Sequence, residues 1–76
     1  MLEILSEHRL TLAQAASEYG RHVQTMSRWI VLGIVGPDGQ RVFLESVRLG
    51  GVIFTSREAI ERFIAKLSAR EAVHVG

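Results

Sequence analysis

The 76-residue sequence contains no cysteine, one proline and one lysine, and aromatic residues make up 7% of it. The absence of cysteine excludes disulfides and thiolate metal sites and is compatible with a reducing compartment. The longest mostly apolar run without a charge, residues 29–36, is far shorter than the roughly 20 residues that cross a bilayer. The first residues do not form the cationic start and following apolar segment that are typical of a signal peptide. We therefore expect a cytoplasmic protein with no membrane partner.

The chain also lacks the groupings that enzymes and metal sites use. Its histidines, His8, His22 and His74, lie in separate segments, and its only aspartate, Asp38, lies in a turn. The glycines of residues 33–39 are spaced as a phosphate-binding loop requires, but no Walker-type lysine follows them. We predict no catalysis, no cofactor and no metal ion.

The apolar content is sufficient for one small folded domain. Apolar residues make up 47% of the chain and charged residues 22%, which argues against disorder. The formal net charge is +1, but it is uneven: residues 1–20 sum to −2, residues 21–50 to +2 and residues 51–76 to +1. The basic centre of the chain is the part best suited to an anionic partner.

The first 19 residues predict an arm followed by a helix. Residues 1–10 mix apolar and charged residues in no clean period, so we expect an N-terminal arm with one turn of helix. Thr11 is a good N-cap, and Gln14 three residues later completes a capping box. The helix that starts there is expected at residues 12–19.

A second helix follows after a short turn. Gly20 supplies the left-handed residue that commonly ends a helix, and His22 is the expected N-cap of a helix at residues 23–32. Apolar residues at steps of three and four, including Met26 and Trp29, form a stripe that needs burial. Two helices joined so closely form a helix-turn-helix corner.

The middle of the chain predicts a loop and then a β-hairpin. Residues 34–40 carry Pro37 and an Asp-Gly pair, which are turn signals, and we expect a loop there. β-branched and aromatic residues then follow with period two in residues 42–49 and 52–55. The Gly50-Gly51 pair between them predicts a two-residue hairpin turn.

The hairpin turn fixes a register. It places Leu49 opposite Val52 and Val47 opposite Phe54, and we assign these four side chains to the core. We expect Trp29 to be packed and to hold the second helix against this hairpin. The outward-facing set is Ser46, Arg48 and Ile53.

The last element is predicted to be an amphipathic helix of about 12 to 14 residues. It starts after Ser56, or after Thr55 in a capping box with Glu58. Glu58 also stands four residues before Arg62, a spacing that favours an ion pair. Its core-facing residues recur at helical spacing, and they are Ile60, Phe63, Ile64 and Leu67.

These elements in order predict an α+β, mostly helical fold: a winged helix-turn-helix with a two-stranded β-hairpin wing and a C-terminal helix. We expect one domain over residues 1–76, with residues 1–10 as the arm and residues 71–76 as a frayed tail.

Several short motifs carry a family resemblance. The run Leu12-Ala13-Gln14-Ala15-Ala16, followed by Gly20, Thr25, Arg28-Trp29 and Gly33, resembles the MerR/excisionase class of winged DNA-binding domains. Residues 44–51 and 55–63 are similar to an uncharacterised bacterial family of small excisionase-like proteins. The likeness extends over residues 10–68. It implies DNA binding without catalysis, as an excision or recombination cofactor or a small transcriptional regulator.

The predicted partner is double-stranded DNA, with the second helix in the major groove and the wing on the backbone. Arg favours guanine and Gln favours adenine, so Gln24, Ser27 and Arg28 are expected to read bases. Phosphate contacts are expected from the turn and the wing. The full predicted set is Arg21, His22, Gln24, Thr25, Ser27, Arg28, Arg41 and Arg48.

Two alternatives remain open at this stage. A solvated surface is the alternative environment for each of these side chains, and Thr25 is expected to help start its helix. The wing tip carries Val52 and Ile53 instead of basic residues. This favours a protein-interaction adaptor that binds a recombinase or a second copy through the wing and the C-terminal helix.

Overall fold

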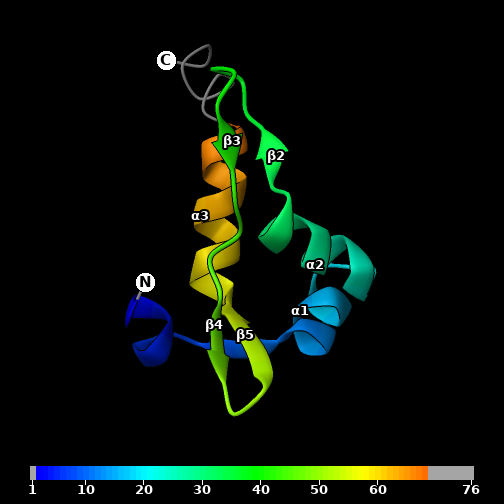
Figure 1. Ribbon diagram of the computed structural model, residues 1–76, viewed down its shortest axis with the longest axis vertical. Coiled ribbons are helices and arrows are strands. Elements are labelled where there is room, and N and C mark those ends of the chain that lie inside the picture. The colour runs from blue at the N-terminus through cyan, green and yellow to red at the C-terminus, as the bar shows by residue number, and fades with distance from the viewer. Residues whose placement is uncertain (1, 69–76) are drawn as a thin grey trace.

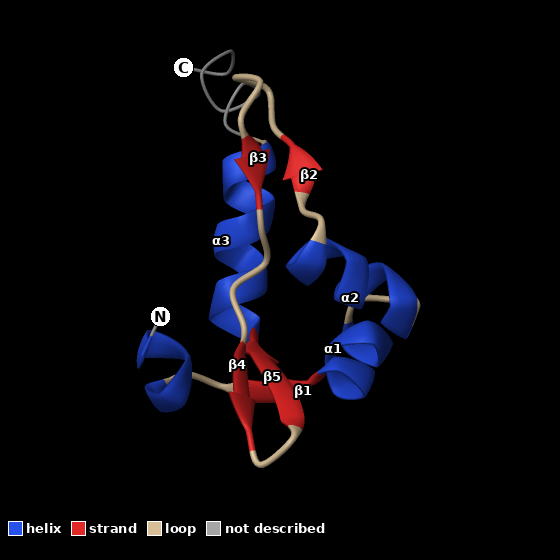
Figure 2. Ribbon diagram, viewed as in Figure 1, coloured by secondary structure: helices blue, strands red, loops and turns tan. Residues whose placement is uncertain are grey.

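The computed structural model describes residues 2–68 and shows an α+β fold with three α-helices and short antiparallel strands (Figures 1 and 2). In chain order the elements are the 3-10 helix η1 (Leu2–Ser6), β1 (Arg9–Thr11), α1 (Leu12–Glu18), α2 (Val23–Val31), β2 (Ile34–Val35), β3 (Arg41–Val42), β4 (Val47–Leu49), β5 (Val52–Ser56) and α3 (Arg57–Leu67). The predicted α+β class is therefore confirmed. The predicted tail, residues 71–76, lies outside the described residues.

The start of α1 follows the capping-box prediction. The Gln14 amide donates to Thr11 Oγ1 at 3.1 Å, and the Thr11 amide donates to Gln14 Oε1 at 2.9 Å. Gly20 has a φ of +62°, as predicted, and the Arg21 amide donates to the Ala16 carbonyl at 2.8 Å. These bonds satisfy both ends of a seven-residue helix and turn the chain toward α2.

α2 begins after His22 and is anchored by its apolar stripe. His22 Nδ1 accepts a hydrogen bond from the Gln24 amide at 3.2 Å, so the predicted cap is present. Met26 is fully buried, and the Trp29 ring packs against Phe63 of α3 with ring centroids 5.1 Å apart. The prediction that Trp29 packs is confirmed, but the hairpin was predicted as the element it packs against, and its aromatic partner is elsewhere. That partner lies on α3 and not on the hairpin.

The segment predicted as a loop, residues 34–40, contains strand β2 and the turn that leads to its partner strand β3. Ile34 pairs with Val42 and Val35 with Arg41, and the intervening turn is closed by the Gly39 amide on the Gly36 carbonyl at 3.0 Å. The turn signals were correct. Strand β2 went unpredicted because two residues are too few to show an alternating pattern, whereas β3 overlaps the start of the predicted strand at Val42.

The strand predicted over residues 42–49 is interrupted between β3 and β4. Leu44 is 2% exposed, and its amide donates to the Trp29 carbonyl at 3.0 Å instead of to a neighbouring strand. The Glu45 carbonyl accepts from Thr55 Oγ1 at 2.9 Å. Burial of the Leu44 side chain therefore bends the chain inward and divides the predicted strand in two.

The arm contributes a strand that the sequence did not predict. β1 pairs antiparallel with β5, which places Leu10 opposite Thr55 in a sheet of order β1-β5-β4. A three-residue strand that contains Arg9 and Thr11 around one buried leucine carries no clear periodic signal. Long-range pairing with β5 determines this strand.

The β4–β5 register is confirmed, with Leu49 opposite Val52 and Val47 opposite Phe54. The assignment of the first of these pairs to the core was wrong, because Leu49 is 38% and Val52 45% exposed. Ile53, predicted to face outward, is half-buried. β1 pairs with β5 only as far as Phe54, so the hairpin tip extends beyond the third strand and its apolar pair remains uncovered.

The core is formed where the helices meet the three-stranded sheet. Ser56 is the last residue of β5 and also the N-cap of α3, where its Oγ accepts from the Ala59 amide at 2.8 Å. Of the two predicted caps, Ser56 is therefore correct and Thr55 is not. The buried apolar side chains of the core are Ile4, Leu10, Ala15, Ala16, Met26, Leu44, Ala59, Ile60 and Phe63.

Gly33, between α2 and β2, is predicted to be the least replaceable left-handed glycine in this region. Gly33 and Gly39 have φ values of +71° and +83°, so alanine costs each about 1–2 kcal/mol. At Gly33 the added Cβ would also lie 2.6 Å from the Val42 carbonyl oxygen, whereas nothing lies within 4 Å at Gly39. Gly33→Ala should lower the Tm in a circular-dichroism melt by several degrees more than Gly39→Ala. Equal losses would contradict this close approach.

Candidate functional site

The candidate site is the side of α2 that faces away from the core. This side consists of Gln24, Ser27, Arg28 and Val31. Each lies three or four residues from two of the others, which places all of them on one side of the helix, opposite the buried Met26. We call these four side chains the outer face of α2. Together with Leu32 they line a shallow hollow of about 510 Å³. Three groups that donate or accept hydrogen bonds therefore lie beside two aliphatic side chains on an open surface.

Two other predicted contact residues in this region have local structural roles. His22 uses Nδ1 to cap α2, which leaves only Nε2 free for a further partner. Thr25 is half-buried on the flank of the helix and does not line the outer hollow. Arg21 is exposed but lines a different hollow of about 310 Å³, beside Trp29 and Phe63. The structure thus divides the predicted helix site between two surfaces.

Arg41 does not belong to the predicted wing. It lies on β3, and its guanidinium donates to the Leu32 carbonyl at 2.8 Å, at the C-terminal end of α2. A cation at that position satisfies a free carbonyl and the negative end of the helix dipole. The prediction missed this role because it depends on the return of β3 alongside Gly33. Arg48 lies on β4 as predicted and is exposed.

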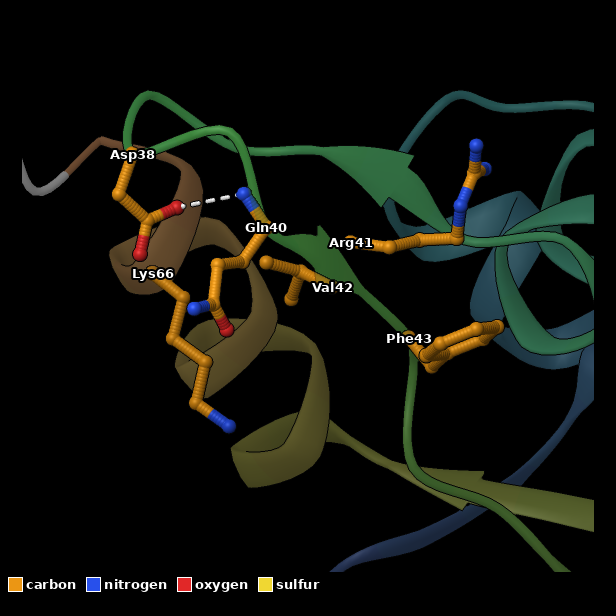
Figure 3. A pocket seen from close by; sticks show the side chains of 6 residues that line it. All are labelled: Asp38, Gln40, Arg41, Val42, Phe43 and Lys66. Carbon is orange, nitrogen blue, oxygen red and sulfur yellow. Dashed lines mark hydrogen bonds between the residues drawn. The ribbon is translucent and has the colours of Figure 1, made fainter.

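Arg41 also lines a hollow of about 550 Å³ together with Gln40, Phe43 and Lys66 (Figure 3). Its side chain extends away from Lys66 in that view, so the two cations do not converge on one point. Asp38 lines the same hollow and accepts from the Gln40 amide at 3.0 Å. Charges of both signs and an open shape give this hollow no preference for an anion.

Most of the described glutamates are paired away from α2. Arg62 donates to Glu7 at 2.8 Å and to Glu45 at 2.6 Å, and so joins α3 to the residue that follows η1 and to the segment before β4. The predicted Glu58–Arg62 pair was wrong, because Glu58 instead lies 2.6 Å from His8 Nδ1. α3 emerges directly from β5, and this directs Arg62 toward Glu7 and Glu45 instead of along its own helix.

These contacts shift the acids toward their charged forms. Hydrogen bonds from Arg62 hold the pKa of Glu7 and of Glu45 below the usual range, and the Ser56 hydroxyl adds to the effect at Glu7. The pKa of Glu18 is lowered by its hydrogen bond from Arg57, where the two groups lie 2.8 Å apart. The acids therefore stay ionised and engaged with their partners.

Five arginines within residues 2–68 form no ion pair: Arg9, Arg21, Arg28, Arg41 and Arg48. The Arg9 guanidinium lies over the Phe54 ring, 5.7 Å from its centroid. Arg28 lies on the outer face of α2, Arg21 in the turn before it and Arg48 on the hairpin. The net charge of the chain is small, but its arginines without an ion-pair partner lie around α2 and the hairpin.

Comparison of the chain with protein-family models, with curated proteins and with solved structures gives no match. Among the described residues, no three His, Asp or Glu side chains are grouped closely enough to hold a metal ion. No helix in that part of the chain combines the length and the apolar character needed to cross a bilayer. The features that bear on function are therefore the outer face of α2 and the distribution of charge.

Val31 is the member of this site that residue-type reasoning missed. The prediction considered hydrogen-bonding and charged residue types, so it included Gln24, Ser27 and Arg28 and omitted an aliphatic residue. The signal was present in the sequence, because position 31 continues the spacing of three and four from Gln24.

The Arg62 pairs predict a specific acid sensitivity. The folded pKa values of Glu7 and Glu45 lie below their ordinary 4.5, so their stabilising effect is complete above about pH 4.5 and is lost as the pH falls below it. Arg62→Met should lower the Tm at pH 7, and the gap from wild type should narrow toward pH 3. Arg48→Met, which removes the same charge from an unpaired site, should give a nearly wild-type curve. A gap that stays constant from pH 7 to pH 3 would show that the ion pairs do not cause the difference.

Proposed function

We propose that this protein is a winged helix-turn-helix DNA-binding domain. α1 and α2 form the helix-turn-helix, α2 lies in the major groove, and the β4–β5 hairpin is a wing that follows the adjacent backbone. In this assignment α1 and the buried stripe of α2 hold the outer face in place. The proposal includes the family resemblance carried by the sequence motifs and a cytoplasmic, non-catalytic protein.

The outer face of α2 is the observation that carries the proposal. Gln24 and Arg28 are exposed there one helical turn apart, and both residue types form bidentate hydrogen bonds with base edges. A nine-residue helix is about 14 Å long, which corresponds to about four base pairs of groove. The outer face therefore has the size and the donors for a short base-reading surface.

The distribution of charge supports the same partner. Glu7, Glu18, Glu45 and Glu58 are paired, whereas Arg21, Arg28 and Arg48 are free of ion pairs in the described part of the chain. A polyanion meets these arginines without first breaking an ion pair. Since few phosphates are neutralised, we expect binding to weaken with salt along a shallow log-log slope.

One small domain makes few base contacts, and this limits the biological role. Specific binding then requires a dimer, neighbouring copies on one site or a bent DNA site. An excisionase-like recombination cofactor and a small transcriptional regulator both work under that limit. We propose this pair of roles without choosing between them.

Selection from a random duplex library at low salt tests DNA binding directly. Wild type should enrich a short motif, and Arg28→Gln should weaken binding to it about tenfold or more, because one bidentate base contact is lost. Lys66→Gln removes the same charge from the exposed end of α3 and should have little effect. Failure to retain any DNA, or equal losses in the two variants, would contradict α2 as the reading helix.

The exposed hairpin tip favours a second function, that of a protein-interaction module. Leu49 and Val52 form a cross-strand apolar pair that no third strand covers. Such a pair suits a second copy of the chain or a recombinase, through the wing and the adjoining α3. Both functions are compatible in one domain, because α2 and the hairpin tip are separate surfaces.

Light scattering over a range of protein concentrations tests this second function. If the tip mediates self-association, wild type should form a concentration-dependent dimer, and Val52→Asp should shift it to monomer without a large change in Tm. Val35→Asp, a matched exposed valine on β2, should leave the dimer intact. A wild-type monomer at every concentration would argue against self-association through the tip.

A further inference from the structure

Val31 is the most exposed of the large apolar side chains in the described part of the chain, at 67%. Its position on the last turn of α2 continues the line of Gln24, Ser27 and Arg28, and it lines the same hollow as they do. Nothing in the fold requires a valine there, because the side chain makes no part of the core. An exposed aliphatic side chain in line with the residues proposed to read bases therefore points to a contact with the DNA.

The major groove offers one apolar group to such a side chain. Of the four bases, only thymine presents a methyl group there, and aliphatic side chains contact it. Valine suits this contact because its branched Cβ leaves little rotamer freedom to lose on binding. Three residues beyond Arg28, Val31 lies about 4.5 Å farther along the helix axis, close to one base step.

We propose that Val31 recognises the 5-methyl group of a thymine next to the base that Arg28 contacts. This inference rests on the proposed function, because it assigns a base preference to the same surface. Gln24 and Arg28 would then read hydrogen-bonding edges, and Val31 would add shape and apolar contact at the C-terminal end of α2.

The charge beside Val31 argues against a second copy as its occupant. In a twofold dimer centred on Val31, the Arg28 side chains of both copies would be brought together, and neither has an acidic partner nearby. Like charges so placed oppose association. DNA reverses the sign of this interaction, because the phosphates on both sides of the groove attract Arg28.

The test replaces each thymine of the selected DNA site, one at a time, by deoxyuridine, which removes only the methyl group. Wild type should lose about fourfold in affinity at one thymine, the effect of about one buried methyl group. Val31→Ala should bind the thymine site more weakly and bind the thymine and uracil sites equally. Val31→Thr, which keeps the shape and one methyl but replaces the other by a hydroxyl, should lose only part of the preference. Ile64→Ala should retain the wild-type preference, because Ile64 of α3, which was wrongly predicted to face the core, is 45% exposed.

The outcomes separate this inference from the function on which it rests. If wild type retains no DNA, the proposed function and the role of Val31 fail together. If DNA is bound and Arg28→Gln weakens it, but uracil is tolerated at every position, only the role of Val31 is overturned. It is also overturned if Val31→Ala keeps the thymine preference, or if that variant changes self-association while leaving DNA affinity unchanged. Melting curves of both Val31 variants should match wild type, because the side chain is outside the core.

Discussion

The guanidinium of Arg62 joins three segments that are remote in the sequence. It binds Glu7, which lies in the arm between η1 and β1, and Glu45, which lies between the two ribbons. Arg62 itself belongs to α3. With the arm held there, β1 reaches β5 and completes the three-stranded sheet. With Glu45 held there, the preceding Leu44 enters the core and the chain leaves toward β4. A small domain without disulfides relies on such a junction to fix segments that its limited core does not fix alone.

The features that sequence reasoning recovered are local ones. The capping box of Thr11 and Gln14, the left-handed Gly20 and the Gly-Gly hairpin register each depend on a few adjacent residues, and each is present in the structure. The outer face of α2 was recoverable for the same reason, since helical spacing alone separates Gln24 and Arg28 from the buried stripe.

What the sequence did not reveal depends on contacts across long separations. β1 exists because β5 lies beside it, and Arg62 meets Glu7 across a separation of 55 residues. The role of Arg41 at the end of α2 required knowledge of the path of β3. The core assignment at the hairpin tip failed because no local rule says where a third strand ends. Tertiary contacts overrode local preference in each of these cases.

Ser56 is the junction between the hairpin and α3. The same residue ends β5 and caps α3, and its hydroxyl also donates to Glu7, so no linker separates the hairpin from the helix. The chain therefore changes from strand to helix at one fully buried residue. The direction of β5 thus sets the direction in which α3 leaves the sheet. The hairpin is connected in this way through α3 to Phe63, whose ring packs on Trp29 of α2.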